Sequence, residues 1–224
     1  MPILSALRRG IDRLVINDPE YRFLFRRQET DEAISLDCET TGFDPWVDDI
    51  ISISAIPIKG KRILTSEAFN VVVRPDAALR AESVKIHQLR LKDLEHGRHM
   101  SDVLPELLHF IGARPIVGYW IDFDIQMLNK YMLKILNIRL PNPLEDVCDL
   151  FYDRKFANAP PGTQLDLRYA TIMKDLGLPD LAAHDAFNDA LGAAEMYVIL
   201  KDMKERGYRI PRAKDDASPF VGVG

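Results

Sequence analysis

The chain has 224 residues, of which 47% are hydrophobic and 28% charged, and its formal net charge is -5. This length allows one substantial core with appendages. No apolar run approaches the roughly 20 residues of a membrane span, and no secretory signal is present, so the sequence excludes a membrane-spanning protein and predicts a cytoplasmic one. The negative charge argues against a broad duplex-coating surface but leaves nucleic acid open as a substrate.

The N-terminal 30 residues form a predicted helical arm. Residues 2–14 carry apolar side chains at helical spacing, and an aromatic and arginine-rich stretch follows over residues 21–27. Two interpretations remain open: a helix packed on the back of the domain, or a docking arm for a partner protein or nucleic acid. We assign residues 31–206 to the main domain and residues 207–224 to a loosely ordered tail.

The main domain begins with three predicted strands and continues with alternating strands and helices. The strands cover residues 33–38, 50–58 and 62–73, and the Lys59-Gly60 turn makes the last two antiparallel. Further on, we predict short strands at 115–118 and 146–150, and helices at 81–87, 101–111 (with Ser101 and Asp102 as cap candidates), 124–136, 165–176 and 185–204. This order predicts an α/β domain with a mixed sheet covered by helices.

The two cysteines, Cys38 and Cys148, each lie in an apolar, strand-like run without a second cysteine or a histidine at metal-binding spacing. We predict that both are buried free thiols rather than redox or zinc-binding residues.

The first strand ends in two carboxylates. Asp37 and Glu39 are two positions apart and therefore share one face of the strand, whereas Cys38 points to the other face. Two neighbouring carboxylates at the end of a buried strand repel each other unless protons or a cation neutralise them. Hard divalent ions such as Mg2+ and Mn2+ prefer oxygen ligands of this kind. A solvated strand end is the alternative.

Two further acidic positions follow at helix starts. Asp124, preceded by Phe123, comes directly after the short strand at 115–118, where a carboxylate also interacts favourably with a helix N-terminus. Asp189 lies on an early turn of the alanine-rich helix that begins at about Asp185, and His184 immediately precedes that helix.

Together these segments resemble the three exonuclease motifs of the DEDDh family, the DnaQ-like 3'-to-5' exonucleases typified by the epsilon subunit of bacterial DNA polymerase III. The matching positions are Asp37-x-Glu39, Phe123-Asp124 and His184-x-Ala186-x-x-Asp189, and the resemblance covers roughly residues 32 to 200. It implies a ribonuclease H-like α/β fold, in which a mixed five-stranded sheet, made of a three-strand antiparallel meander plus two parallel strands, is flanked by helices.

The resemblance also implies substrate contacts. Thr40, Thr41 and Gly42 look like the loop whose backbone touches the terminal nucleotide, and His87 lies in a segment with a similar role. Phe123 is a candidate for base stacking or for the core, and Trp120, with Tyr119, for pocket lining or the core. Residues 147–150 resemble the strand that follows the second motif. The chain departs from the family at Tyr119-Trp120, where relatives often have His-Asn, and at Gln88, where they have Gly.

The implied chemistry is hydrolysis at a free 3' end, with release of nucleoside 5'-monophosphates. Asp37, Glu39, Asp124 and Asp189 carry about four negative charges, which two divalent cations, Mg2+ or Mn2+, would balance in a two-metal mechanism. His184, with a reference pKa of about 6.5, would accept a proton from the attacking water. As an alternative, His184 only caps the following helix. Asp122 and Asp185 are expected to be solvated or capping residues.

Three functions therefore compete. The first is an exonuclease acting on single-stranded or frayed DNA 3' ends, and the second is an RNA-trimming enzyme akin to oligoribonuclease or RNase T, because the same ligands serve either sugar. The third is a catalytically silent adaptor that binds a partner through its arm or tail. A proofreading role would require a separate polymerase partner, because no polymerase domain fits within this chain.

Overall fold

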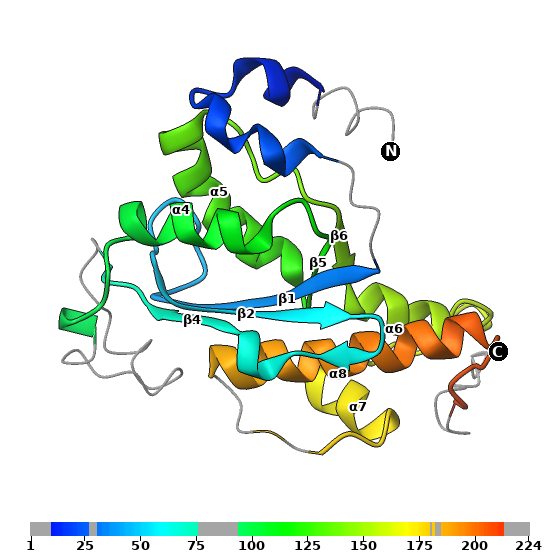
Figure 1. Cartoon of the computed structure of the whole chain (residues 1–224). Helices are drawn as coiled ribbons and strands as arrows, with labels where there is room; N and C mark the ends of the chain where they lie inside the picture. Colours follow the sequence, from blue (N-terminus) through cyan, green and yellow to red (C-terminus); the bar gives the residue numbers. More distant parts are fainter. Residues whose placement is uncertain (1–9, 27–30, 76–93, 180, 182–184, 213–224) are drawn as a thin grey trace, which may run out of the picture.

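A computed structural model describes residues 10–26, 31–75, 94–179, 181 and 185–212. Figure 1 shows a sheet with helices on both faces. None of the helices in these described parts is long and apolar enough to cross a membrane. The strands are β1 (Glu32–Thr40), β2 (Ile50–Lys59), β3 (Arg62–Ile63), β4 (Phe69–Val72), β5 (Ile116–Gly118) and β6 (Leu144–Asp146). The helices are η1 (Pro19–Phe25), η2 (Thr65–Glu67), α4 (Met100–Ile111), α5 (Ile121–Leu136), α6 (Val147–Lys155), α7 (Tyr169–Asp175) and α8 (Ala186–Glu205).

The sheet is mixed, as predicted. Its strand order is β3-β2-β1-β5-β6, and β4 pairs with β2 beside β3. The pairs of β2 with β1, β3 and β4 are antiparallel, whereas β5 is parallel to β1 and β6 is parallel to β5. The described part of the chain forms six strands rather than the expected five. The difference arises because the predicted strand at 62–73 is interrupted by η2, where the Glu67 amide donates to the Leu64 carbonyl.

The sheet separates two hydrophobic cores, and β1 contributes to both. Ile34, Leu36 and Cys38 pack in the core that includes α4 and α5, whereas Ala33 packs in the core that includes α6, α7 and α8. This alternation is the expected period of a strand. Cys38 and Cys148 are both buried and free, which confirms that part of the prediction for the cysteines.

Both described ends of the chain lie against the domain. Residues 10–15 are helical, η1 follows, and Leu24 of η1 is fully buried in the core under α4 and α5. At the other end, Ile210 is buried and its amide donates to the Arg154 carbonyl of α6. These contacts favour the packed-helix interpretation for residues 10–26. The predicted domain boundaries stay a prediction.

Three local predictions were wrong. The predicted strand at 146–150 ends at Asp146, because the Asp146 carboxylate accepts a hydrogen bond from the Cys148 amide and starts α6 at Val147. The segment 147–150 is therefore helical. The helix predicted from 165 begins only at Tyr169, and α4 is preceded by His99, not capped by Ser101 or Asp102. The helix predicted at 81–87 lies outside the described residues.

Candidate active site

The end of β1 presents two carboxylates toward α8. Ser35, Asp37 and Glu39 share the face of β1 opposite to Leu36 and Cys38. The Ser35 hydroxyl, which is fully buried, donates a 2.7 Å hydrogen bond to the Ala190 carbonyl of α8. This bond joins β1, which carries Asp37, to α8, which carries Asp189.

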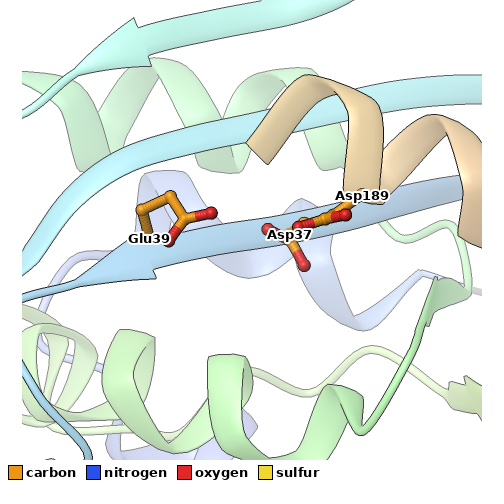
Figure 2. A group of neighbouring side chains, drawn as sticks. All are labelled: Asp37, Glu39 and Asp189. Atoms are coloured by element: carbon orange, nitrogen blue, oxygen red, sulfur yellow. The ribbon is translucent and has the colours of Figure 1, made fainter. Parts of the chain in front are cut away.

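That helix supplies a third carboxylate. Asp185 caps α8, because its side chain accepts hydrogen bonds from the amides of Phe187 and Asn188, as expected for a capping residue. Asp189 follows one turn later. The ligand oxygens of Asp37, Glu39 and Asp189 all lie within 4.8 Å of one another, and we call these three residues the carboxylate cluster. Figure 2 shows their side chains converging over β1 from the strand and from the first turns of α8.

Asp124 lies beside this cluster but is oriented by the backbone of β1. It sits in the first turn of α5, is only 5% exposed, and accepts a 2.8 Å hydrogen bond from the Cys38 amide through Oδ1. The Cys38 amide lies beyond the part of β1 that pairs with β5, which ends at Ser35. Asp124 therefore satisfies a strand donor that no neighbouring strand reaches.

The carboxylates are held where their charged forms are disfavoured. Burial raises the pKa of Asp37 well above its usual range, and the charges of Asp124, Asp189 and Glu39 raise it further. Burial, followed by the charges of Asp189 and Asp185, raises the pKa of Glu39 to about 7. Burial also raises the pKa of Asp124, although the hydrogen bond from the Cys38 amide acts in the opposite direction.

These residues suit divalent cations. Burial and mutual repulsion disfavour the charged forms of Asp37 and Glu39, and bound cations would relieve this cost. An all-oxygen donor set of this kind matches the preference of Mg2+ and Mn2+. The assignment of Asp124 as a fourth ligand stays a prediction. Its Oδ1 accepts the hydrogen bond from the Cys38 amide, so Oδ2 is the oxygen that we expect to bind a cation.

Aromatic side chains line the rest of the pocket. The pocket has a volume of about 400 Å³, and besides the four acidic residues and Cys38 it is lined by the aromatic wall, which consists of Phe43, Tyr119, Trp120, Phe123 and Tyr169. The ring centroids of Phe43 and Phe123 are 6.1 Å apart, and those of Tyr119 and Tyr169 are 5.2 Å apart. The predicted contacts Trp120 and Phe123 thus lie beside the cluster, and Trp120 is 56% exposed.

Trp120 adopts a backbone conformation that is rare for a bulky side chain. It is the residue before α5 and has φ 54° and ψ 38°, in the left-handed region. Strain of this kind concentrates at functional sites. Trp120, which lines the pocket, is therefore a strained position, and we call it the strained corner.

The loop after β1, residues 41–49, is held by its own hydrogen bonds, and we call it the anchored loop. Thr40 donates its hydroxyl hydrogen to the Gly42 carbonyl. The hydroxyl of Thr41, a buried residue, accepts from the Asp49 amide. A side chain at Gly42 would overlap the Asp48 carboxylate. The contacts that Thr40, Thr41 and Gly42 were predicted to make with substrate stay a prediction. In the structure, the hydroxyls of Thr40 and Thr41 both form hydrogen bonds with residues of the loop.

Helix α5 fixes the anchored loop from the outside. The Lys130 ammonium donates to the Asp48 carbonyl at 2.9 Å and pairs with the Asp49 carboxylate at 2.6 Å, while the Tyr131 hydroxyl donates to the same carboxylate. Hydrogen bonds thus join the loop to α5, and these two segments carry Phe43 and Phe123 to the same pocket.

Two predicted residues, His87 and His184, lie outside the described residues. Two others, Phe43 and Tyr169, line the pocket although the sequence reasoning missed them. A signal existed for Phe43, an apolar residue that directly follows the Thr40-Thr41-Gly42 segment. Tyr169 had no local signal, because its place depends on Gly192 of α8, where any side chain would overlap the Tyr169 hydroxyl.

Comparison with known proteins decides the family. The family model of RNase T type, described as an exonuclease, matches residues 34–197, a span that includes all four acidic residues. The chain belongs to this exonuclease family. The match confirms the resemblance to the DnaQ-like exonucleases that the three motifs predicted.

Relatives of this exonuclease include replication proteins. The DNA polymerase III subunit epsilon of Aquifex aeolicus is 28% identical over 173 residues, which cover 76% of this chain and 81% of that protein. The DNA polymerase III PolC-type protein of Thermotoga maritima is 28% identical over 201 residues, or 88% of this chain. The match spans only 14% of the Thermotoga protein.

Solved structures confirm the ribonuclease H-like fold of the family. A zinc-bound complex of Escherichia coli exonuclease I with single-stranded DNA superposes with a TM-score of 0.66 at 18% identity, covering 80% of this chain and 42% of that one. Exonuclease X in complex with a 5' overhanging duplex gives a TM-score of 0.59 at 19% identity, covering 83% and 99%.

Proposed function

We propose that this exonuclease is a metal-dependent 3'-to-5' enzyme that hydrolyses phosphodiester bonds at single-stranded or frayed DNA 3' ends and releases nucleoside 5'-monophosphates. The observation that carries the proposal is the carboxylate cluster, whose oxygens lie within 4.8 Å of one another in a pocket with an aromatic wall. Such a pocket can hold a phosphate group beside the cluster and a base against the rings.

The proposed metal ligands are Asp37, Glu39, Asp124 and Asp189, which would hold two divalent cations, Mg2+ or Mn2+. When bound, such cations supply positive charge that balances the carboxylates and the substrate phosphate. The chain itself contributes the geometry: β1 and α8 hold the cluster, and the Ser35 hydroxyl ties these two elements together.

His184 is the proposed general base. It immediately precedes Asp185, the cap of α8, and would take a proton from the attacking water as the 3' oxygen leaves the phosphorus. We expect His184→Ala to reduce kcat by roughly 100- to 10,000-fold, the usual contribution of a general base. Activity of the wild type should fall as His184 is protonated below a pH of about 6.5, and the variant should lose this part of its pH profile.

His109→Ala is a suitable control, because His109 is a half-exposed histidine on α4. It should retain both the rate and the pH profile. A His184→Ala variant with wild-type kcat would leave helix capping as the role of this histidine.

The proposed polarity and sugar preference can be tested together. We expect a 5'-labelled single-stranded DNA to yield a ladder of progressively shorter products, and a 3'-labelled one to yield labelled mononucleotide at once, with Mg2+ or Mn2+ present. DNA is favoured over RNA because the relatives are named as DNA polymerase subunits and the structural neighbours hold DNA. If a matched RNA is trimmed at least as fast, the DNA assignment fails.

A separate replicative polymerase is the proposed protein partner. The support is the similarity to the DNA polymerase III subunit epsilon of Aquifex aeolicus, because the match covers 81% of the length of that subunit. The test is co-elution of the purified chain with the replicative polymerase of the same organism in size-exclusion chromatography. Independent elution at micromolar concentrations of both would argue against a stable complex.

A further inference from the structure

A second groove lies on the outer side of the anchored loop, between that loop and α5. It has a volume of about 100 Å³, and the side chains that matter here are those of Trp46, Gln126, Lys130, Leu133 and Arg139. None of these residues lines the first pocket. The anchored loop thus separates two hollows, with Phe43 in the first and Trp46 in the second.

Trp46 is exposed, but its backbone is fixed. The side chain is 79% exposed. Its amide donates to the Asp44 carboxylate at 2.9 Å, and the Asp48 amide donates to the Asp44 carbonyl at 2.7 Å. Because these hydrogen bonds hold the backbone of the loop, an aromatic ring placed here offers a flat apolar surface at low entropic cost.

The groove is basic, although the whole chain has a net charge of -5. Lys130 and Arg139 line it, and no carboxylate is among its described lining residues. Lys130 is paired with Asp49, whereas Arg139 is exposed and makes no ion pair within the described residues. A planar guanidinium can bind a phosphate through two hydrogen bonds.

We propose that this groove binds a nucleotide two or more positions upstream of the 3'-terminal nucleotide, in the same single strand whose 3' end occupies the first pocket. Trp46 stacks on its base and Arg139 pairs with a backbone phosphate. This inference rests on the proposed function. A nucleic acid fits better than a protein partner, because one hydrogen-bonded loop presents an aromatic ring to each hollow and because the second groove combines its ring with a cation.

The test is the length dependence of hydrolysis. Kinetics are measured for single-stranded DNA of two and of twelve nucleotides, with Mn2+, for the wild type and for Trp46→Ala. Stacking of one base predicts that Trp46→Ala raises KM for the longer substrate roughly 5- to 150-fold and leaves KM and kcat for the dinucleotide unchanged. Trp46→Phe should restore most of the affinity. The control is Tyr208→Ala, which removes an aromatic side chain that is 60% exposed far along the chain.

Arg139 gives a second, independent readout. The Arg139→Ala variant should lose one phosphate contact to the single strand. For the longer substrate, the slope of log KM against log salt should therefore decrease by about 0.7. The Arg62→Ala variant, which changes an exposed arginine of β3, should keep the wild-type slope.

The outcomes separate the two proposals. If the wild type digests neither substrate, the proposed function fails. If the wild type digests both but Trp46→Ala changes neither KM, or changes both equally, the upstream subsite is wrong and the proposed function stands. In that case, the exposed ring belongs to another surface, such as a protein contact.

Discussion

The carboxylate cluster and the aromatic wall share one pocket, but they are held in different ways. The cluster stands on β1 and α8, two regular elements joined by the bond from Ser35 to Ala190. Much of the wall stands on the anchored loop and on the residues around the start of α5, where single hydrogen bonds set the backbone. The difference suggests that the charge geometry and the base-contacting geometry can be altered separately.

The largest expected effect comes from the cluster itself. Asp37→Asn should reduce activity by more than about 100-fold, because even the outer partners of metal ligands cost about 10- to 100-fold when changed. It should also abolish the rise in Tm that we expect Mn2+ to cause in the wild type, since a ligand that binds only the folded state stabilises it. Asp122→Asn, an exposed change in the first turn of α5, is the control.

A catalytically silent adaptor would behave differently. In that case, Asp37→Asn would retain the biological activity of the chain, and the wild type would release no nucleotides under any metal condition. Retention of nucleotide release by Asp37→Asn would contradict the role of the cluster.

The support of the cluster is tested by a pair of serines. Ser35 and Ser54 are both buried, and each donates one 2.7 Å hydrogen bond, Ser35 to α8 and Ser54 to Asn70 of β4. Each alanine variant should lose about 0.5–1.5 kcal/mol of unfolding free energy in urea. Of these two variants, Ser35→Ala should also lose activity, by roughly 10-fold, because the bond from Ser35 joins the two elements that carry the proposed metal ligands. Equal activity in the two variants would contradict the positioning role.

The wall is tested at the anchored loop. Gly42→Ala would place a methyl group on the Asp48 carboxylate, so we expect a loss of about 1–3 kcal/mol in unfolding free energy and a higher KM, because Phe43 would move. Gly10→Ala is the matched control, because a side chain there meets no atom within 4 Å. A stable Gly42→Ala variant with wild-type KM would show that the loop is not rigid.

A smaller effect is expected at the strained corner. Asparagine tolerates the left-handed conformation better than other residues, so Trp120→Asn should be more stable than Trp120→Ala by about 1 kcal/mol. Both variants lose the ring and should raise KM to a similar degree. Denaturant unfolding of the two proteins measures the difference, and equal stability would argue against backbone strain at this position.

The pH dependence of stability tests the raised pKa of Glu39 in the carboxylate cluster. In metal-free protein, the folded pKa of Glu39 is about 7 and its ordinary value is 4.5, so the folded state binds more protons between these values. Stability should therefore decrease as pH rises from about 4.5 to 7, when measured by Tm in EDTA. Glu39→Gln should flatten this decrease. A rise in Tm over the same range would contradict the raised pKa.

Local pattern predicted the parts of the site that depend on neighbouring residues. The common orientation of Asp37 and Glu39 follows from strand alternation, and the place of Asp189 early in α8 follows from the capping position of Asp185. That these two segments meet could be predicted only from the resemblance to a family, because no local property of either segment encodes a contact over 150 residues. The mixed sheet, in contrast, was predicted from local turn and strand signals.

The failures have physical causes that lie outside the local pattern. Residues 147–150 carry side chains that suit a strand, but Asp146 caps a helix there and its other oxygen accepts from the Ile121 amide, so the strand ends where two helices start. Similarly, residues 165–168 stay non-helical because the Asp166 carboxylate accepts from the amide of Arg168 and the hydroxyl of Thr171. These carboxylates act through partners that a periodicity count does not include.

The hydrogen bond between the Cys38 amide and Asp124 gives the site a built-in spectroscopic probe. The Cys38 amide donates its hydrogen bond to a carboxylate oxygen of Asp124, a proposed metal ligand. Cys38 belongs to β1, which pairs along its length with β2. The nitrogen and proton resonances of this amide should therefore move when Asp124 changes its charge or its ligand, while amides on the far side of the sheet stay in place. A single backbone signal can thus follow cation loading in solution, without substrate and without turnover.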